Sequence, residues 1–391
     1  MTGRPMTTPG VSVGDVLALI RANAVATRSD IARVTGLSRT AVTLRVDQLL
    51  AQGLVTERSE GPSTGGRPPS RLRFAPDAGV VLAASIGASR AQVAVCDLAG
   101  EVLAQNEFTV PAAHEARAVL SAATDHLDRL LTERSAAPVY GVGVGVGVGV
   151  PTVVDAASGH ALSPADLDEI AVSDLFRTRF SAPVRVDTDV NVLALAEHAR
   201  RPGVNDLLLL KASTGIGVGI IAGGSQQRGA WGAAGEIGHI KVSGGIGRPC
   251  RCGDTECLET VAGGWALLEQ FTALGRTASD LPALADLAAA GDPDALRLVR
   301  QAGRSIGEVM AAAVNLLNPA VIVVRGDLSR AFDPLAAGLR EQIYRRSSAL
   351  NTRALRIEPA APDAPTGVQA CAAMILDDTL APAAINARLA C

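Results

Sequence analysis

The sequence lacks several features that mark particular classes of protein. No stretch reaches the roughly 18 uninterrupted apolar residues of a membrane span. The first residues, Met1-Thr-Gly-Arg-Pro, have no apolar core behind their positive charge, as a secretory leader would. Six cysteines among 391 residues are too few for a disulfide framework. Charged residues make up only 19% and apolar residues 48%, a composition that excludes a disordered chain. We therefore expect a globular, cytoplasmic protein of two or three domains.

Lysine is also scarce, since Lys211 and Lys241 are the only two among 36 basic residues, a bias that we attribute to codon composition. The net charge of −3 is unevenly distributed along the chain. Residues 1–74 hold ten arginines and five acids, a balance of +5, and the remaining residues have a balance of −8. This asymmetry predicts that the two parts of the chain bind different partners.

Residues 1–76 have the pattern of three short helices followed by a hairpin. Apolar residues recur at helical spacing over 13–21, and Thr27 and Ser38 are placed to cap a second and a third helix. Two strand-like runs follow, separated by the glycine- and proline-rich loop 61–69. This order predicts a winged helix-turn-helix, which is a DNA-binding domain.

The third predicted helix carries residue types that read DNA. Arginine can pair with guanine and threonine can touch a thymine methyl group, so we expect major-groove contacts from Arg39, Thr40, Thr43 and Arg45. Arg67 in the following loop is a candidate for the minor groove. Because one such module reads few base pairs, we expect a homodimer or homotetramer on double-stranded operator DNA.

From residue 77 onward, β-rich runs alternate with helical runs, which predicts a mixed α/β domain at 77–391. Residues 139–150 repeat valine and glycine, and we interpret them as a buried strand whose glycine face is pressed by a neighbour, rather than as a nucleotide loop. The other expected strands are 80–86, 91–97, 101–108, 184–186, 207–211, 217–221 and 321–324, and the expected helices are 117–133, 190–198, 263–275, 292–317 and 335–346.

Several motifs together resemble the ROK family, which joins repressors, open reading frames and sugar kinases on an actin-like, ribonuclease-H-like fold of two lobes. The most specific are Gly232-Ala-Ala-Gly-Glu-Ile-Gly-His239 and Cys250-Arg-Cys-Gly-Asp-Thr-Glu-Cys-Leu-Glu259. They match the family patterns G-x-x-G-E-I-G-H and C-x-C-G-x-x-x-C-L-E. The resemblance implies a first lobe at about 77–187 with a returning C-terminal helix at 367–378, and a second lobe at about 188–366.

The cysteines that crowd into eight residues, together with one histidine, predict a metal site. Zn²⁺ prefers four soft or borderline ligands in a tetrahedron, and His239, Cys250, Cys252 and Cys257 supply that set. The alternative, free cysteines in a surface loop, would leave thiols open to oxidation. We expect the zinc to be structural, because four protein ligands leave no open position for catalysis.

Sugar-binding residues follow from the resemblance, since a carboxylate can accept hydrogen bonds from two adjacent hydroxyls. The matching positions are Asp189, Glu236 and Glu259, and His239 is implied to link the metal to the sugar pocket. Asn191 is a further candidate, the alternative being that it only positions a strand-to-helix turn. The alternative for Glu259 is a carboxylate stabilised by a helix dipole.

The phosphate-binding motif departs from that of the family's kinases. They carry D-x-G-G-T, whereas this chain has Ser85-Ile-Gly-Ala-Ser, with Ser85 in place of the acid and Ala88 in place of a glycine. Losing the acid that organises Mg²⁺ should cost much of the rate of phosphoryl transfer. The second phosphate loop is kept at 213–219 and the base at Asp189, but Arg325 replaces a glycine where the nucleotide approaches.

These observations favour a transcriptional regulator, a repressor of carbohydrate genes, whose effector is a sugar or sugar phosphate and which is not an enzyme. The main alternative is an ATP-dependent sugar kinase with an attached DNA-binding domain. A third hypothesis is that the effector is another protein that docks on the zinc-bearing lobe.

Overall fold

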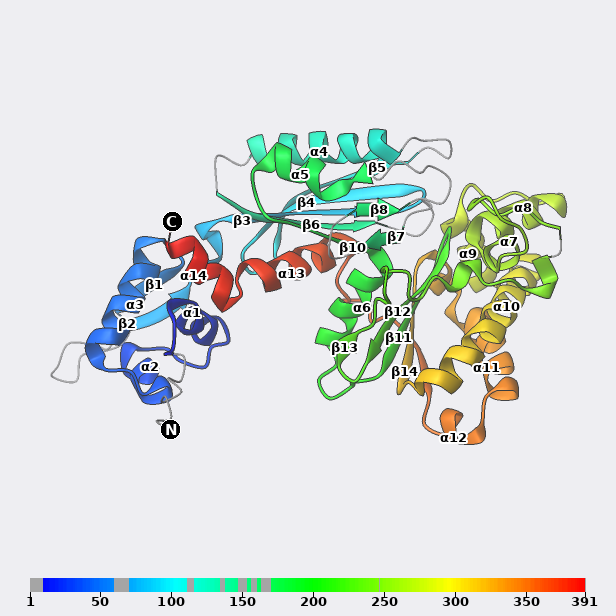
Figure 1. Cartoon of the computed structure of the whole chain (residues 1–391). Coiled ribbons are helices and arrows are strands. Elements are labelled where there is room, and N and C mark those ends of the chain that lie inside the picture. The colour runs from blue at the N-terminus through cyan, green and yellow to red at the C-terminus, as the bar shows by residue number, and fades with distance from the viewer. Residues whose placement is uncertain are drawn as a thin grey trace, which may run out of the picture.

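The computed structural model arranges the chain as a helical N-terminal domain followed by two α/β lobes (Figure 1). The structure describes residues 10–59, 70–110, 116–133, 138–146, 153–155, 160–162, 170–245 and 247–390. The predicted loop 61–69, which contains Arg67, and the end of the valine-glycine run at 147–150 lie outside these described residues.

The N-terminal domain has the predicted order of three helices and a two-stranded antiparallel sheet. Thr27 and Asp30 form a reciprocal capping box, and the Ser38 hydroxyl accepts a hydrogen bond from the amide of Ala41. These caps confirm where the second and third helices begin. The elements are α1 (Val13–Arg21), α2 (Arg28–Thr35), α3 (Arg39–Ala51), β1 (Val55–Ser59) and β2 (Ser70–Phe74).

The first lobe is a five-stranded sheet in the order β10-β6-β3-β4-β5. Two helices, α4 (Ala116–Thr132) and α5 (Val172–Phe180), cover one face, and α13 (Gly367–Thr379) covers the other (Figure 1). The strands of this sheet are β3 (Val80–Ile86), β4 (Arg90–Asp97), β5 (Val102–Thr109), β6 (Val139–Val146) and β10 (Val184–Thr188). Smaller elements are η1 (Pro76–Ala78) and the three-stranded sheet of β7 (Val153–Asp155), β8 (His160–Leu162) and β9 (Ile170–Ala171).

The glycine face of β6 lies directly under α13. A Cβ atom built on Gly143 would lie 2.1 Å from the carbonyl oxygen of Cys371, and one on Gly141 would lie 2.6 Å from Ile375. A side chain at either position would push the helix off the sheet. The prediction of a strand pressed closely on its glycine face is therefore confirmed for the described part of the run.

The second lobe is a five-stranded sheet in the order β13-β12-β11-β14-β15. Its strands are β11 (Leu207–Ala212), β12 (Ile216–Ala222), β13 (Ser225–Gln226), β14 (Val321–Arg325) and β15 (Arg356–Pro359). The α-helices are α6 (Asp189–Ala199), α7 (Glu259–Ala262), α8 (Gly264–Ala273), α9 (Leu281–Ala289), α10 (Pro293–Leu317), α11 (Phe332–Arg346) and α12 (Ala349–Thr352). The 3-10 helices are η2 (Ile237–His239), η3 (Ser243–Gly245) and η4 (Asp327–Ala331).

Some elements differ from the sequence-based expectation. The helix expected over 263–275 is present as α8, with the extended Gly263 as its N-cap, and the short helix α7 that precedes it was not expected. The helices α5 and α9 and the strand β15 were not expected; β15 is a four-residue edge strand that ends in proline, which weakens its signal.

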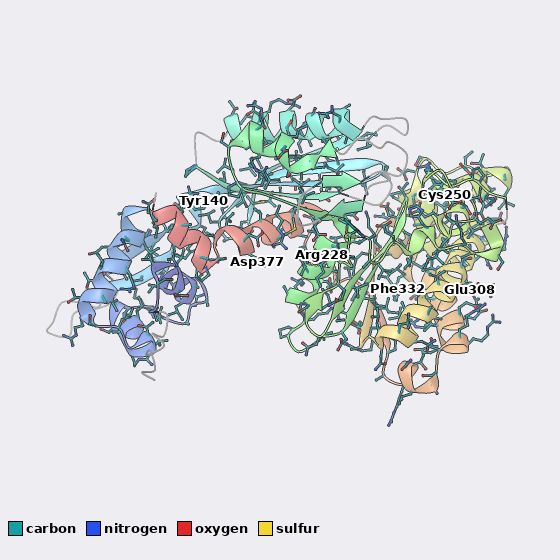
Figure 2. All side chains as sticks on the ribbon, viewed as in Figure 1. Tyr140, Arg228, Cys250, Glu308, Phe332 and Asp377 are labelled. Atoms are coloured by element: carbon teal, nitrogen blue, oxygen red, sulfur yellow. The ribbon has the colours of Figure 1, made fainter. Side chains whose placement is uncertain are left out.

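A further helix beyond the predicted returning helix joins the C-terminus to the N-terminal domain. This helix, α14 (Pro382–Ala390), follows α13 after a 62° bend and packs against α1. The amide of Gly14 donates a 2.9 Å hydrogen bond to the side-chain oxygen of Asn386. At the same junction, Arg388 stacks on the ring of Tyr140 from β6, 3.7 Å from its centroid. Figure 2 labels Tyr140 at this place. The C-terminal helix thus contacts both the first lobe and the DNA-binding domain.

Within the described residues, no single helix is long and apolar enough to cross a membrane. The bent pair of α13 and α14 passes the test of length and composition when the two are taken together.

We predict that Gly14→Ala weakens the docking of α14 on α1. A Cβ atom at this position would lie 2.2 Å from the carbonyl oxygen of Pro382, so the two helices must separate. Alanine gains about 1 kcal/mol in an isolated helix, so a lower thermal midpoint would report lost packing rather than lost helix propensity. As a control, the same change in a chain that ends at residue 380 should be neutral or stabilising. A loss of stability in both backgrounds would contradict the role assigned to this contact.

Candidate functional site

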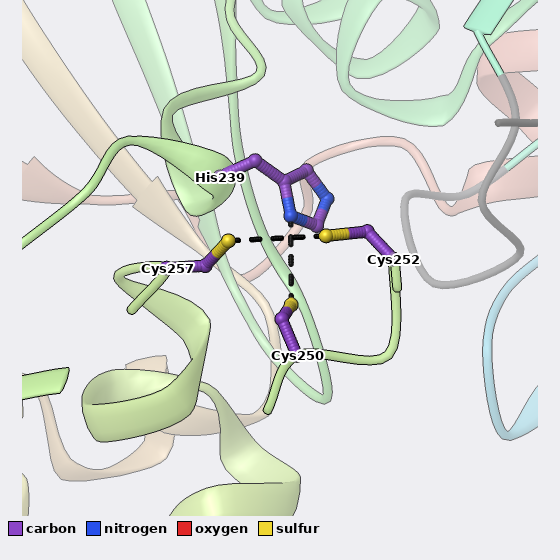
Figure 3. Close-up of side chains that lie close together, drawn as sticks. All are labelled: His239, Cys250, Cys252 and Cys257. Carbon is purple, nitrogen blue, oxygen red and sulfur yellow. Dashed lines mark hydrogen bonds between the residues drawn. The ribbon is translucent and has the colours of Figure 1, made fainter. Parts of the chain in front are cut away.

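Four side chains with metal-ligating atoms converge at one end of the second lobe. The ligand atoms of His239, Cys250, Cys252 and Cys257 all lie within 4.8 Å of one another (Figure 3). The Cys252 and Cys257 sulfurs are 3.8 Å apart, and the Cys250 sulfur is 3.7 Å from Nδ1 of His239. Tetrahedral ligands at a Zn–S distance of about 2.3 Å lie about 3.8 Å apart. The geometry therefore fits the four-coordinate site that the sequence predicts.

The chemistry of this donor set also fits a metal ion. Burial raises the pKa of the Cys250 thiol to about 12, so without a metal this thiol is protonated at neutral pH. Lys241 lies beside the cluster, with its Nζ 3.6 Å from the Cys257 sulfur and 2.5 Å from the Asp254 carboxylate. A divalent cation would replace the thiol protons, and Lys241 would offset the remaining negative charge of three thiolates and one Zn²⁺.

His239 joins the cysteine cluster to the neighbouring acids. It ends the short helix η2, and its two ring nitrogens face in different directions. Nδ1 faces Cys250, and Nε2 lies 3.9 Å from the Glu236 carboxylate. A metal on Nδ1 would therefore fix the orientation of the imidazole and of the carboxylate beside it.

Two carboxylates, Glu236 and Glu259, lie near this histidine, and a third, Asp189, lies near Glu236. Glu259 is 3% exposed, and its Oε1 accepts a 2.7 Å hydrogen bond from the Ile216 amide at the start of β12. Asp189 is 5% exposed and forms an ion pair with Lys211. Burial, together with the charges of Asp189 and Glu259, raises the pKa of Glu236 to about 7. Buried acids that crowd together in this way suit a ligand that donates hydrogen bonds, as sugar hydroxyls do.

Asn191 lies deeper than the other expected sugar ligands. It is fully buried, and its amide donates a 2.7 Å hydrogen bond to Asp187, which also accepts a 2.7 Å bond from Arg228. This network spans the turn from β10 into α6. The placement favours the alternative in which Asn191 positions the turn that carries Asp189.

The altered phosphate motif lines a cavity of about 240 Å³ between the two lobes. Ser85 and Ala88 line it from the first lobe, and Lys211 and Arg325 line it from the second. Asp189, at the expected base position, also lines this cavity and is paired with Lys211. Lys211 is a site residue that no motif predicted, and its only sequence signal is that it is one of two lysines in the chain.

The exposed face of α3 carries three of the expected DNA-contacting residues. Arg39, Thr40 and Thr43 are all exposed in the described structure. Arg28 of α2 connects this helix to the sheet, because its guanidinium lies 2.9 Å from the Asp47 carboxylate of α3 and 3.0 Å from the Glu57 carboxylate of β1.

The structure gives Arg45 a different role from the one expected. Its guanidinium donates hydrogen bonds to the backbone carbonyls of Val11, at 2.8 Å, and Ala41, at 3.0 Å. Residue 45 follows the buried Val42 by three positions, so helical spacing places it at the edge of the buried face. Arg45 therefore fastens the segment before α1 to α3.

Comparison with known proteins identifies the family. The model of the ROK family matches residues 81–377, and a model of winged helix-turn-helix DNA-binding domains matches residues 14–56. The chain belongs to the ROK family. Among its ROK relatives, the xylose repressor of Caldicellulosiruptor bescii is 27% identical over 93% of this chain and 95% of its own length. A glucokinase of Halalkalibacterium halodurans is 30% identical over 66% of this chain and 82% of its own length.

A solved ROK structure has the same architecture over nearly the whole chain. It is a ROK family transcriptional regulator, described as a homologue of the E. coli MLC protein, with 24% sequence identity and a TM-score of 0.76. The match covers 97% of this chain and 99% of that one. The expected fold, a winged helix-turn-helix followed by a two-lobed ROK domain, is therefore confirmed.

We predict that Cys252→Ser lowers the zinc content and the thermal stability together. The variant keeps the loop but removes one of four ligand atoms, so the protein purified from zinc-containing medium should hold well under one zinc per chain. We expect the thermal midpoint to fall by about 4 °C or more. Metal content measured by mass spectrometry and calorimetry on the same samples check this. Asp254→Asn, in the same loop but outside the ligand set, is the matched control and should keep its metal; full zinc occupancy in the serine variant would refute the ligand assignment.

Proposed function

We propose that this chain is a sugar-responsive, DNA-binding repressor of carbohydrate genes. The observation that carries the proposal is the combination of a winged helix-turn-helix with a ROK domain whose acid cluster is intact and whose phosphate motif has lost its acid at Ser85. The named activity of the xylose repressor supports it. As a DNA-binding regulator the protein acts in the cytoplasm.

In this proposal, α3 enters the major groove of the operator. Arg39, Thr40 and Thr43 read base edges, since their side chains are exposed on one helix. Arg67 in the loop between β1 and β2 remains our candidate for the minor groove. Arg45 contributes indirectly, by holding the segment before α1 in place. Two such modules in a homodimer, or two pairs in a homotetramer, bind an inverted repeat.

The effector is a sugar or sugar phosphate whose hydroxyls bind Asp189, Glu236 and Glu259. The buried positions of Asp189 and Glu259 and the raised pKa of Glu236 support this role, because hydroxyl donors relieve the cost of crowding the three acids. Zinc is structural, and through His239 it keeps Glu236 in place. His239 itself contributes its free ring edge to the sugar pocket.

The C-terminal helices provide a route from this pocket to the DNA-binding domain. Asp189 is the first residue of α6, and α6 packs on α13. The next helix, α14, packs on α1. If a sugar binds one arrangement of the two lobes more tightly than another, its binding would shift α13 and, with it, the DNA-binding domain.

A kinase activity is the second candidate, favoured by the glucokinase relative and by the retained Asp189. The ion pair between Lys211 and Asp189 opposes it, because a base must be free to accept the proton of the attacking hydroxyl. Ser85 opposes it as well, since it cannot organise Mg²⁺ as an acid does.

The proposal is tested by binding the full-length protein to its own upstream DNA, measured by fluorescence anisotropy at fixed salt with and without sugars and sugar phosphates. We expect specific binding that at least one member of the panel changes. Arg39→Ala should weaken specific binding by about ten-fold, the effect of losing one base contact. Arg297→Ala removes an exposed arginine of α10 and is the charge-matched control, which should bind as the wild type does. Absence of specific binding would overturn the proposal.

We also predict that the protein does not turn over ATP with a hexose panel. Release of ADP should stay far below the roughly 1 s⁻¹ at the lower end of ordinary enzyme rates, because the base is paired and the acid is replaced. A coupled assay for ADP, validated with a commercial hexokinase, checks this. Turnover near 1 s⁻¹ or faster would establish the kinase instead.

A further inference from the structure

The exposed face of α3 carries a large apolar side chain among its polar ones. Among the described residues of the DNA-binding domain, the large apolar side chains that are exposed are Val34 of α2 and Leu44 of α3, and Leu44 is 60% exposed. A single exposed leucine is common on protein surfaces and by itself indicates nothing. The place of Leu44 on its helix is what points to a role.

Leu44 lies on the side of α3 that faces away from the core of its domain. Val42 and Val46, two residues to either side, are both buried. Because a helix turns by about 100° per residue, a residue two positions from each of them lies about 160° away, on the opposite side. Thr40 is one turn earlier and Thr43 is the preceding residue, and both are exposed. Leu44 therefore lies near the centre of the face that the proposed function directs into the major groove.

The charged neighbours of Leu44 on α3 already have partners within the domain. Arg45 donates hydrogen bonds to two backbone carbonyl groups. The Asp47 carboxylate, three residues after Leu44, lies 2.9 Å from the guanidinium of Arg28. This pairing offsets a negative charge that would repel DNA phosphates. The helix therefore presents a group of methyl-bearing side chains at this point: Thr40, Thr43 and Leu44.

The partner that fits this group is the major groove of DNA. The winged helix-turn-helix match at residues 14–56 includes α3, and the balance of +5 over residues 1–74 complements the phosphate backbone. The base edges in the major groove carry hydrogen-bond donors and acceptors, and the one apolar group among them is the 5-methyl group of thymine. A leucine side chain offers the polar groups no hydrogen bond, so it favours the methyl group.

We infer that Leu44 is a further specificity-determining residue of the DNA-binding domain, which selects an A·T base pair by packing on the 5-methyl group of its thymine. The inference rests on the proposed function and names the base that one side chain of α3 recognises. Contact with the methyl group removes the leucine from water. A donor or acceptor at the same place would lose its water without gaining a partner, and this cost disfavours the other three bases.

The test uses the operator in the protein's own upstream DNA. Its thymines are replaced one at a time by deoxyuridine, which keeps the base pairing and the O4 acceptor and lacks only the 5-methyl group. Binding of the full-length protein is measured by fluorescence anisotropy at fixed salt. We expect one position of the half-site at which the replacement weakens binding about four-fold, the effect of losing one buried methyl group.

Three variants assign the methyl contact to one side chain. Leu44→Ala should bind the thymine and deoxyuridine operators equally, because the group that contacts the methyl is gone. Thr40→Ser and Thr43→Ser each remove only a side-chain methyl group, and both should keep the difference between the two operators. An unchanged far-UV circular dichroism spectrum is expected for Leu44→Ala, since alanine favours a helix at an exposed position.

Leu316→Ala is the matched control. It removes a leucine that is 83% exposed on α10, outside the DNA-binding domain. This variant should bind every duplex as the wild type does. An equal loss of operator affinity in Leu316→Ala and Leu44→Ala would show that the loss does not come from a base contact, and it would overturn the inference.

The remaining outcomes separate this inference from the proposed function. If the protein binds its upstream DNA specifically and no thymine depends on its methyl group, the proposed function stands and the inference is overturned. The inference is also overturned if the dependence persists in Leu44→Ala, or if a serine variant loses it instead. If the protein does not bind its upstream DNA specifically, the proposed function fails and the inference fails with it.

Discussion

The close packing of α13 on the glycine face of β6 is the contact on which the rest of the structure depends. The backbone of the helix approaches the strand so nearly that Gly143 has no room for a side chain against Cys371. Because the helix is held at this distance, its N-terminus meets Ser85 at the interlobe cavity and its C-terminus leads into α14 beside α1. One helix thus reaches the interlobe cavity at its N-terminus and is connected through α14 to the DNA-binding domain.

Features with local signals could be predicted from the sequence, and features that depend on distant partners could not. The caps at Thr27 and Ser38 and the period-two glycine face were predictable because the residues that form them are neighbours in the chain. The docking of α14 depends on a contact between residues 14 and 386, which no local pattern announces. The pairing of Lys211 with Asp189 likewise joins a strand to the start of a helix, and these residues meet only in the folded lobe. The same holds for Arg45, which donates a hydrogen bond to the carbonyl oxygen of Val11.

The acid cluster and the cysteine cluster constrain each other through a single imidazole. Burial disfavours the charged form of Glu236, and the charges of Asp189 and Glu259 add to this cost, which is why the pKa of Glu236 rises to about 7. Glu236 remains placed for a ligand only if His239 is fixed, and four ligand atoms around one metal would fix it. In the proposed role, zinc contributes no chemistry and still determines whether the sugar pocket has a defined shape.

A sensor and an enzyme built on this fold need different groups at the phosphate motif. Phosphoryl transfer needs an acid that organises Mg²⁺ and a base that is free to take a proton. In this chain a serine, Ser85, stands at the first position, and the carboxylate at the second, Asp189, is paired with Lys211. In the proposed role, these changes disable the groups that phosphoryl transfer needs and leave the acids that would bind a sugar. A site of that kind equilibrates with the concentration of its ligand instead of consuming it, which is the property that a regulator of DNA binding requires.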